Sequence, residues 1–310
     1  MYWTSSSSTD QYANKWRVQR RVAGGSAETL LSNQAPSLGS LLLGTERLFL
    51  LNLDQGAIQS MKADGSSLRT DEAGALTLRF HSGRIYWHDQ EPVSNGGKGG
   101  AWYDVIIKSQ SETDPSDVTQ YQGTVGRPDA AGPAEIADLT FAGASVAFGL
   151  NRLTYPDEDI DVYQIVIIGD PTFASVFPPS PGRLEQLDCD GNDNYYWRMR
   201  ASSSGGADLL MQNDGASSAT TIATGVDVTD FTLSQSASGK TFVYYAYSDS
   251  SKQTNGIRLY DTASGMTYDV VGDDEAGSLV ADDTYLYFFE VNGRRLLRTP
   301  LPHLVFGLGA

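Results

Sequence analysis

The stretch Gly277-Ser-Leu-Val-Ala-Asp-Asp-Thr-Tyr-Leu-Tyr-Phe-Phe-Glu-Val-Asn-Gly-Arg-Arg-Leu-Leu-Arg-Thr-Pro300 decides the fold. It predicts three short strands at 278–281, 285–291 and 294–299, because runs of apolar, β-branched and aromatic residues are bounded there by turn residues. Asn292-Gly293 is typical of a hairpin turn, since both residues tolerate a positive φ. A meander of three strands cannot bury its own apolar face, so we expect the sequence to repeat this unit.

Strand anchors similar to Tyr285-Leu286-Tyr287 recur along the whole sequence, about 40 to 60 residues apart. The seven anchors are Tyr2-Trp3, Leu48-Phe49, Ile85-Tyr86-Trp87, Val146-Ala147-Phe148, Tyr195-Tyr196-Trp197, Phe242-Val243-Tyr244 and Tyr285-Leu286-Tyr287. This spacing is typical of propeller blades, and no segment keeps a helical periodicity over three turns. We therefore predict an all-β chain with almost no helix. It forms a single β-propeller domain over residues 1–310, with seven four-stranded blades as the expected count and six or eight left open.

Parts of the sequence resemble a known repeat. Met1-Tyr-Trp-Thr, Arg84-Ile-Tyr-Trp-His-Asp and the segment from Thr284 onward look like the strand signature of YWTD-type and related bacterial β-propellers. In that signature a strand reading YWTD leads into a hairpin strand reading xGxIxRxxL. The repeat pattern covers nearly the whole chain, and the first, third and last units carry it closely. The resemblance implies the propeller fold, and it implies binding or scaffolding less directly, because propellers also host enzymes.

The two ends of the chain bear on how the ring closes. Met1 lies directly on a strand anchor, and the tail at 304–308 is a spare strand candidate. We expect the tail to pair with the N-terminal unit, because an open propeller leaves unpaired strand edges. The alternative is a native N-terminus that lies further upstream.

Composition limits the classes of function. The chain has 310 residues, 40% of them apolar, which is enough for a sizeable core. A formal net charge of −16 argues against nucleic acid or an anionic membrane as partner, since both need a basic surface. Cys189 is the only cysteine, which excludes an internal disulfide and a thiolate metal cluster. The 3 histidines stand in separate contexts, so we expect no histidine-rich metal centre.

The sequence also indicates a location. No run of about 18 apolar residues occurs, so we predict no membrane insertion. The first residues lack the basic and then apolar pattern of a signal peptide. Asp outnumbers Glu and Lys is scarce, which favours an extracellular setting. We therefore expect an extracellular or cell-surface protein, with the periplasm left open.

One loop has the donor pattern of a calcium site. Calcium prefers about six to eight oxygen ligands, and oxygen donors stand here at alternating positions around Gly191. The ligands would be Asp188, Asp190, Asn192 and Asp193. The bidentate acid that completes an EF-hand is absent, so a plain β-turn is the alternative. We expect no cofactor, with calcium at this loop as the open alternative.

Other acidic residues also fall in predicted loops. They are Asp157, Glu158, Asp159, Asp161, Asp273, Asp274, Glu275, Asp282 and Asp283. Such runs are usually a solvated face, although carboxylates could also bind a cation or act as acid and base. Asp188, Asp190, Asp282 and Asp283 each lie between the first and second strands of a predicted blade. Propeller geometry therefore predicts that these carboxylates share one rim.

Aromatic residues offer a second candidate site. Trp87, Trp102, Tyr195 and Trp197 could form a platform on which a sugar stacks. In the alternative interpretation they belong to the core between blades.

Together these features predict a non-catalytic, secreted or surface-exposed propeller that binds a protein or carbohydrate partner or acts as a scaffold. A carbohydrate-active enzyme, lyase or hydrolase, with loop carboxylates on one rim is the first alternative. A subunit of a larger surface assembly is the second. An enzyme needs acidic side chains that converge in a concave pocket, whereas a scaffold needs a broad patch.

Overall fold

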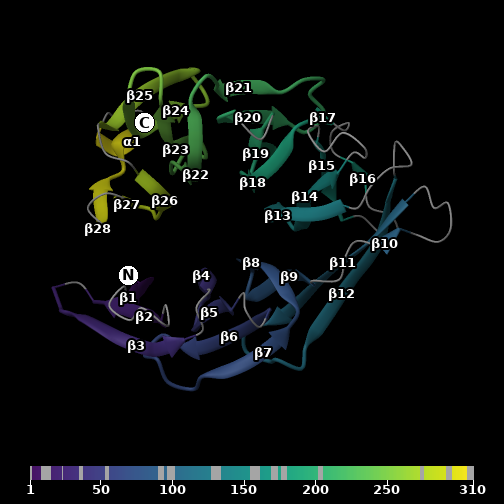
Figure 1. Cartoon of the computed structure of the whole chain (residues 1–310), viewed down its shortest axis with the longest axis vertical. Helices are drawn as coiled ribbons and strands as arrows, with labels where there is room; N and C mark the ends of the chain where they lie inside the picture. Colours follow the sequence, from purple (N-terminus) through teal and green to yellow (C-terminus); the bar gives the residue numbers. More distant parts are fainter. Residues whose placement is uncertain are drawn as a thin grey trace. The chain divides into compact units, whose positions relative to one another are not determined.

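The computed structural model describes most of the chain. The described residues are 2–7, 15–22, 24–34, 38–52, 56–89, 94–95, 102–126, 134–153, 161–168, 174–175, 180–201, 205–272, 276–290 and 295–305. The chain divides into two compact units, which we call unit 1 (Met1–Arg127) and unit 2 (Pro128–Ala310). Both units consist of antiparallel sheets (Figure 1).

Unit 1 contains three sheets, each built from consecutive strands. The first comprises β1 (Tyr2–Ser7), β2 (Lys15–Arg21) and β3 (Ala27–Gln34). The second comprises β4 (Leu38–Leu43), β5 (Arg47–Asn52), β6 (Ala57–Lys62) and β7 (Arg69–Ala73). The third comprises β8 (Ala75–His81), β9 (Arg84–Asp89), β10 (Ser94–Asn95), β11 (Trp102–Ser111) and β12 (Val118–Gly126).

Unit 2 contains four sheets of the same kind. Its first comprises β13 (Ala134–Ala142), β14 (Ser145–Leu153), β15 (Asp161–Ile167), β16 (Ala174–Ser175) and β17 (Ser180–Pro181). The second comprises β18 (Arg183–Cys189), β19 (Asn194–Arg200), β20 (Ala207–Asn213) and β21 (Thr220–Ala223). The third comprises β22 (Asp227–Gln235), β23 (Thr241–Asp249), β24 (Thr254–Asp261) and β25 (Met266–Gly272). The fourth comprises β26 (Ala276–Ala281), β27 (Tyr285–Glu290) and β28 (Arg295–Pro300).

The second strands are apolar at successive positions because both of their faces are covered. In β5, Phe49 and Leu51 point into the core shared with the third sheet, whereas Leu48 and Leu50 point into the core shared with the first. A strand packed on both sides reads as a continuous apolar run, since its side chains alternate between two cores. Strand β23 divides its side chains between two cores in the same way.

The strand pattern predicted from the anchors is largely confirmed. Six anchors lie on the second strand of their sheet, and Tyr2-Trp3 lies on β1. The predicted all-β chain with almost no helix is also confirmed. The pair Asn292-Gly293 lies outside the described residues, while β27 and β28 on either side of it pair as expected.

The predicted count of seven four-stranded blades is wrong. Five of the sheets have four or five strands, but the sheets at β1–β3 and β26–β28 have three each. Together those two sheets have six strands, which is enough for only one further four-stranded blade. The described strands therefore suffice for six complete blades, the lower of the counts that the sequence left open.

Side chains at bulges tie the first strands of unit 2 to one another. Asp138, at a bulge in β13, accepts a hydrogen bond from the amide of Leu187 in β18 at 3.0 Å. Asp230, at a bulge in β22, accepts one from the amide of Leu279 in β26 at 2.6 Å. Between them, Gln186 donates from Nε2 to a carbonyl of β22 at 2.9 Å. These bonds fix how the first strands are aligned along their length. They thereby place the turns that follow those strands next to one another.

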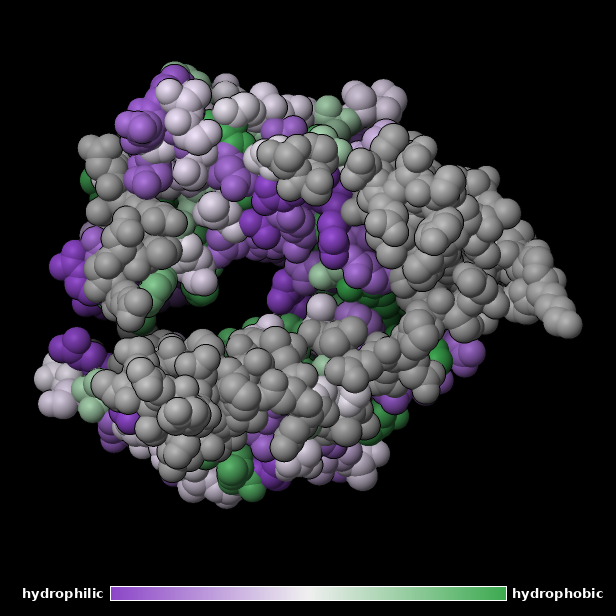
Figure 2. Space-filling model, in the orientation of Figure 1, coloured by the Kyte–Doolittle hydropathy of each residue, from purple (hydrophilic) through white to green (hydrophobic). Residues whose placement is uncertain are grey.

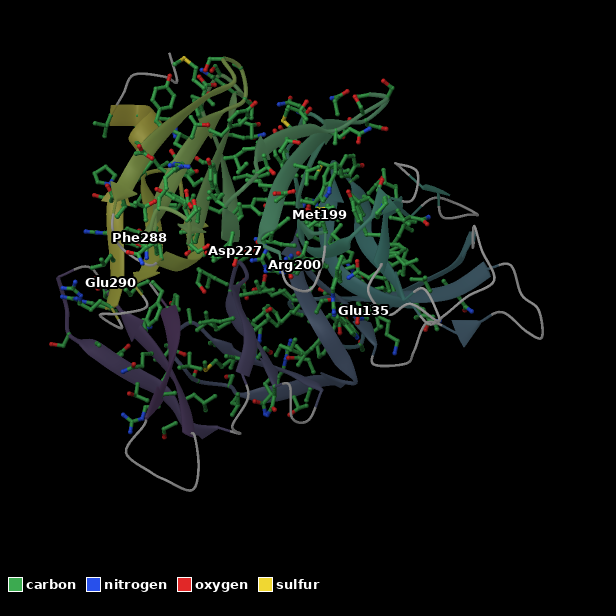
Figure 3. All side chains as sticks on the ribbon, turned by 45° about the horizontal axis from the view of Figure 1, so that its top comes forward. Glu135, Met199, Arg200, Asp227, Phe288 and Glu290 are labelled. Carbon is green, nitrogen blue, oxygen red and sulfur yellow. The ribbon has the colours of Figure 1, made fainter. Side chains whose placement is uncertain are left out.

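The opposite end of these sheets carries ion pairs, in which Glu135, Arg200, Asp227 and Glu290 take part (Figure 3). The pairs are Arg183–Glu135 at 2.8 Å, Arg200–Asp227 at 3.3 Å and Arg295–Glu290 at 2.7 Å. The Arg183–Glu135 and Arg200–Asp227 pairs are partly or well exposed, so each contributes little to stability, about 0–1 kcal/mol. Glu290 is buried, whereas its partner Arg295 is exposed. Acidic groups at this end of unit 2 are therefore matched by arginines. Hydrophilic residues also cover the visible face of unit 2 where Figure 1 places β18 and β22 (Figure 2).

The C-terminal tail differs from its predicted form. Residues Pro302–Val305 form the short helix α1, so Leu304 and Val305 do not belong to a strand. Both side chains point to solvent, with exposed fractions of 54% and 67%. Residues 306–308, the rest of the predicted strand, lie outside the described residues. Pro302 and His303 are the buried residues of this helix, and the ring of His303 packs on Phe242 of β23. In the part of the chain that the structure describes, no helix is long and apolar enough to cross a membrane.

Candidate ligand-binding pocket in unit 2

Three neighbouring sheets of unit 2 form a pocket where their first strands end. Its volume is about 280 Å³. The lining residues are Asp188, Cys189, Asp190, Gly191, Leu233, Ser234, Gln235, Ala281, Asp282 and Asp283. They come from the β18–β19 turn, from the end of β22 and from the β26–β27 turn. We call this site the rim pocket.

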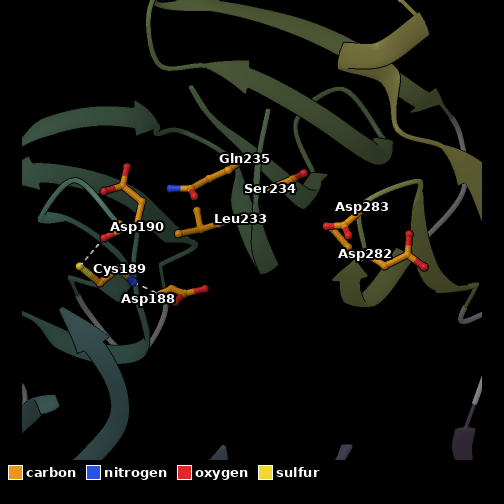
Figure 4. Close-up of a pocket in the computed structure, with 10 residues that line it drawn as sticks. Asp188, Cys189, Asp190, Leu233, Ser234, Gln235, Asp282 and Asp283 are labelled. Carbon is orange, nitrogen blue, oxygen red and sulfur yellow. Dashed lines mark hydrogen bonds between the residues drawn. The ribbon is translucent and has the colours of Figure 1, made fainter. Parts of the chain in front are cut away.

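The rim pocket brings together the carboxylates that the sequence placed on one rim. Asp282 and Asp283 lie across the pocket from Asp188 and Asp190, with the end of β22 between the two pairs (Figure 4). The reason is the shared level of the first strands, which places equivalent turns side by side. Among the described residues that line the pocket there is no Lys, Arg or His. The pocket therefore has a negative electrostatic potential, in contrast to the paired charges at the other end of the strands.

Asp190 is the structural centre of the β18–β19 turn. Its side chain is buried, with 4% exposed. Oδ1 accepts hydrogen bonds from the amides of Asn192 at 2.9 Å and Asn194 at 3.1 Å. Oδ2 accepts from the hydroxyls of Tyr196 at 3.0 Å and Thr241 at 2.7 Å. Because Thr241 belongs to β23, this one carboxylate closes its own turn and joins it to the next sheet.

Asp188 and Asp282 are also held in place by hydrogen bonds. Oδ1 of Asp188 accepts from the amide of Cys189 at 2.8 Å and from the hydroxyl of Thr140 in β13 at 3.1 Å. Oδ1 of Asp282 accepts from the amide of Tyr285 at 2.7 Å, and Oδ2 accepts from the hydroxyl of Tyr287 at 2.9 Å. These bonds fix the carboxylates before any ligand arrives.

The ionisation of Asp282 follows from the same contacts. Partial burial alone would raise the pKa of this carboxyl, but the hydrogen bonds from the Tyr285 and Thr284 amides and the Tyr287 hydroxyl, together with the charge of Arg298, outweigh it. The net effect is a lowered pKa, so Asp282 is a carboxylate at neutral pH. A general acid would need the opposite shift. Asp282 is therefore suited to attract a cation and unsuited to donate a proton.

The pocket thiol has an unusual environment. Burial, and then the nearby charges of Asp190, Asp188 and Asp193, raise the pKa of Cys189 to about 12. Its Sγ also donates to the carbonyl of Asp190 at 3.3 Å. Since only the thiolate is a good nucleophile, the thiol is inert at neutral pH although it lines a pocket.

We expect Cys189 to react about a thousandfold more slowly in the native chain than in the unfolded chain at pH 8. The thiolate fraction is about 1 in 10,000 for a pKa near 12, against about one quarter for an ordinary thiol. The measurement is the rate of reaction with an aromatic disulfide reagent, with and without urea. Equal rates in the two conditions would contradict the argument.

The loop singled out for calcium is stabilised without a metal. Asn192 donates from its own Nδ2 to the carbonyl of Gly239 at 3.2 Å, and Asp193 has a φ of 57°, which Asp tolerates better than most residues. Within the described ranges, no group of three or more His, Cys, Asp or Glu side chains is arranged to hold a metal ion. The oxygens of Asp190 already serve donors of the protein. The calcium site at Asp188, Asp190, Asn192 and Asp193 stays a prediction.

The aromatic candidates occupy other positions. Trp87 is buried between the second and third sheets of unit 1, and Tyr195 and Trp197 are buried between the first two sheets of unit 2. A sugar-stacking platform needs exposed ring faces, so these positions match the core alternative. Trp102 is the first residue of β11, and its side chain lies outside the described residues.

Sequence reasoning missed part of the pocket. Ser234 and Gln235 line it but were not singled out, because neither carries a charge. Their signal was positional, since they lie at the end of a first strand as Asp188 does. The acidic runs at 157–160 and 273–275 lie outside the described residues, and Asp161 begins β15.

Comparison with solved structures identifies the fold. The β-propeller domain of the Trilobed protease from Pyrococcus furiosus matches with a TM-score of 0.65 and 10% identity, over 96% of this chain and 90% of that one. A puromycin-hydrolyzing peptidase from Mycobacterium tuberculosis matches with 0.54 and 11% identity, over 96% of this chain and 51% of that one. TolB from Acinetobacter baumannii matches with 0.51 and 12% identity, over 86% and 62%. No protein-family model and no curated protein sequence matches the chain.

These likenesses establish the class of the protein. At such low identity they show the fold alone, which is a β-propeller. The chain spans about half of the mycobacterial peptidase and somewhat less than two thirds of TolB. Because propellers of this shape occur in peptidases and in other proteins alike, function has to be argued from the site.

Proposed function

We propose that the chain is a non-catalytic binding module whose rim pocket holds a cationic group of a partner, most simply the Lys or Arg side chain of a peptide. The observation that carries this proposal is the set of four carboxylates, Asp188, Asp190, Asp282 and Asp283, in one pocket whose described lining has no basic residue. An ammonium or guanidinium group would neutralise this charge and displace water from the pocket.

The geometry of the carboxylates supports binding over catalysis. Three of them accept hydrogen bonds from turn amides or neighbouring hydroxyls, which holds them in fixed positions. The pKa of Asp282 is lowered, so at neutral pH it carries charge and no transferable proton. A preorganised, charged pocket gains affinity for a cation because little ordering is needed on binding.

The wider parts of the proposal concern location and partner. We propose an extracellular or surface-exposed setting, in which the chain binds a protein partner on its own or as a subunit of a larger assembly. The net charge of −16 supports a basic partner and disfavours nucleic acid. A calcium ion at the β18–β19 turn is kept as a second cationic ligand, because the same carboxylates are hard oxygen donors.

We expect a tetralysine peptide to bind the native chain in isothermal titration calorimetry and a tetraglutamate peptide not to bind. The Asp282→Asn, Asp283→Asn double variant should lose about tenfold in affinity, which corresponds to about 1.4 kcal/mol for two charges at a partly exposed site. Binding should weaken as salt is raised from about 0.05 to 0.3 M, because these charges are screened.

The control removes the same net charge elsewhere. Glu28 and Glu135 are exposed and lie outside the pocket, so the Glu28→Gln, Glu135→Gln variant should bind tetralysine like the native chain. Equal losses in the two variants would show that only net charge matters and would contradict the pocket. The same titration with calcium chloride decides whether the second ligand binds, and recovery of a cleaved peptide would contradict the non-catalytic role.

A further inference from the structure

The C-terminal helix α1 is attached to unit 2 by the buried residues Pro302 and His303, and the preceding Leu301 is part of the same core. The imidazole of His303 stacks on the ring of Phe242, with the ring centroids 4.2 Å apart and the planes 7° apart. The residue is 1% exposed. Leu304 and Val305, the described residues that follow it, face solvent. Of the two buried helix residues, only His303 can change its charge, so its protonation acts directly on the docking of α1.

A pair of hydrogen bonds fixes the protonation state of the docked ring. The amide of His303 donates to the hydroxyl of Tyr244 at 3.4 Å, and the heavy atoms Tyr244 Oη and His303 Nδ1 are 2.8 Å apart. Because burial disfavours a charged imidazole, we assign the hydroxyl proton to the bond with Nδ1. Nδ1 is then an acceptor, and the imidazole is neutral with its proton on Nε2. A second proton on Nδ1 would meet the hydroxyl proton head-on.

The charged groups around the ring add to this effect. Lys240 lies 5.0 Å from the centroid of the same Phe242 ring, measured from Nζ. The Asp261 carboxylate at the end of β24 holds that ammonium at 3.0 Å. Tyr244 on β23 is the titratable group in contact with the imidazole. A protonated His303 would therefore lie near the positive charge of Lys240. The carboxylate of Asp261 is already paired with that lysine.

We propose that α1 is a pH-sensitive latch, which protonation of His303 at mildly acidic pH releases from β23. Release moves the imidazole into water, where both nitrogens can carry protons. It leaves the Tyr244 hydroxyl free to reorient and separates the imidazolium from Lys240. This proposal does not rest on the proposed ligand of the rim pocket.

The direction of the pH effect follows from linkage. Burial first, and then the charge of Lys240, lower the pKa of His303 below its ordinary value of 6.5. The docked state therefore binds fewer protons than the released state. Docking is at full strength above about pH 6.5 and is lost as the pH falls toward the docked pKa. The released population rises by up to about tenfold for each pH unit in that window.

The latch lies close to the rim pocket along the chain. Thr241, which stands between Lys240 and Phe242, donates to Asp190 of the pocket at 2.7 Å. Release of α1 uncovers the adjoining Phe242. Release of α1 can therefore affect the pocket through Thr241 of β23. A change in pocket affinity with pH is measured separately from the docking of α1.

The test is hydrogen exchange of the native full chain between pH 7.5 and pH 4.5, corrected for the intrinsic pH dependence. The amides of Leu304 and Val305 donate to the carbonyl of Leu301 at 3.0 and 3.3 Å, so they report the helix directly. We expect their protection to fall by about tenfold per pH unit below 6.5 until the docked pKa is reached. Equal protection at pH 7.5 and pH 4.5 would overturn the proposal.

The matched variant is the double replacement His303→Phe, Tyr244→Phe. It keeps an aromatic ring on Phe242 and removes the imidazole and the hydroxyl together, so that only the long 3.4 Å hydrogen bond from the backbone amide of residue 303 is lost as well. Its helix should be protected equally at both pH values, and a pH dependence equal to that of the native chain would contradict the latch.

If the double variant does not fold, the imidazole of the native chain decides the question. Its titration by nuclear magnetic resonance should give a pKa below 6.5 together with helix release in the same range. A pKa at or above 6.5 in a chain whose helix stays protected would contradict the proposal.

Discussion

Replacing Glu112 with Ala is expected to destabilise the chain by about 3 kcal/mol or more, because its carboxylate is the acceptor for three consecutive backbone amides. Oε1 accepts from the amides of Glu46 and Arg47, both at 2.7 Å, and Oε2 accepts from that of Thr45 at 3.0 Å. The residue follows β11 and is 2% exposed. It therefore fastens the β4–β5 turn of one sheet to the end of a strand in the next.

The side chain of Glu112 is closely packed against the β4–β5 turn. A Cβ at Gly44 would lie 2.9 Å from Cδ of Glu112 and 3.0 Å from Cε2 of Phe80, so the turn is packed directly against the carboxyl group. Removal of the side chain leaves a cavity and strands the buried amide of Arg47. Glu112→Gln keeps the volume but turns one acceptor into a donor that faces amides, so it should also destabilise the chain.

The control for Glu112 is its neighbour in the turn. Glu46 carries the same side chain but faces solvent, and Glu46→Ala should change the free energy of unfolding by less than about 0.5 kcal/mol. In thermal melts followed by circular dichroism, Glu112→Ala should melt at least about 5 °C below Glu46→Ala. If the two variants melt together, the carboxylate does not hold the turn.

The repeat pattern could be predicted from the sequence because each apolar run lies within one short segment of the chain. A second strand that packs on both faces reads as a continuous apolar run, and the run from Leu48 to Leu51 shows this directly in the sequence. The shared rim of Asp188 and Asp282 was predictable for a related reason. Equivalent turns in neighbouring blades lie at one level once the blades are assumed, and the pocket bears this out.

The contacts that depend on distant residues were not predictable. Glu112 meets a turn more than 60 residues earlier in the chain, and nothing in its own segment marks it as buried. The strand assignment for Leu304 failed because a short apolar run does not distinguish a strand from a helix. The docking of the helix involves His303, whose partner Tyr244 on β23 lies 59 residues earlier.

The second large effect is expected at Asp190. From the sequence, removal of its charge in a plain turn should be neutral or mildly stabilising, since like charges would be relieved. The structure reverses that expectation, because the carboxylate is buried and accepts from Asn192, Asn194, Tyr196 and Thr241. Asp190→Ala should destabilise the chain by about 2–4 kcal/mol, since these donors lose a charged acceptor in a buried site.

Two measurements distinguish a structural role of Asp190 from a role in binding alone. The control is Asp193→Asn, which keeps a side chain tolerant of the observed φ of 57° and should leave the melting temperature nearly unchanged. Asp190→Ala should lower the melting temperature by several degrees with and without millimolar calcium. A variant as stable as the native chain in chelator, but no longer stabilised by calcium, would mean that Asp190 acts as a metal ligand and that its hydrogen bonds contribute little.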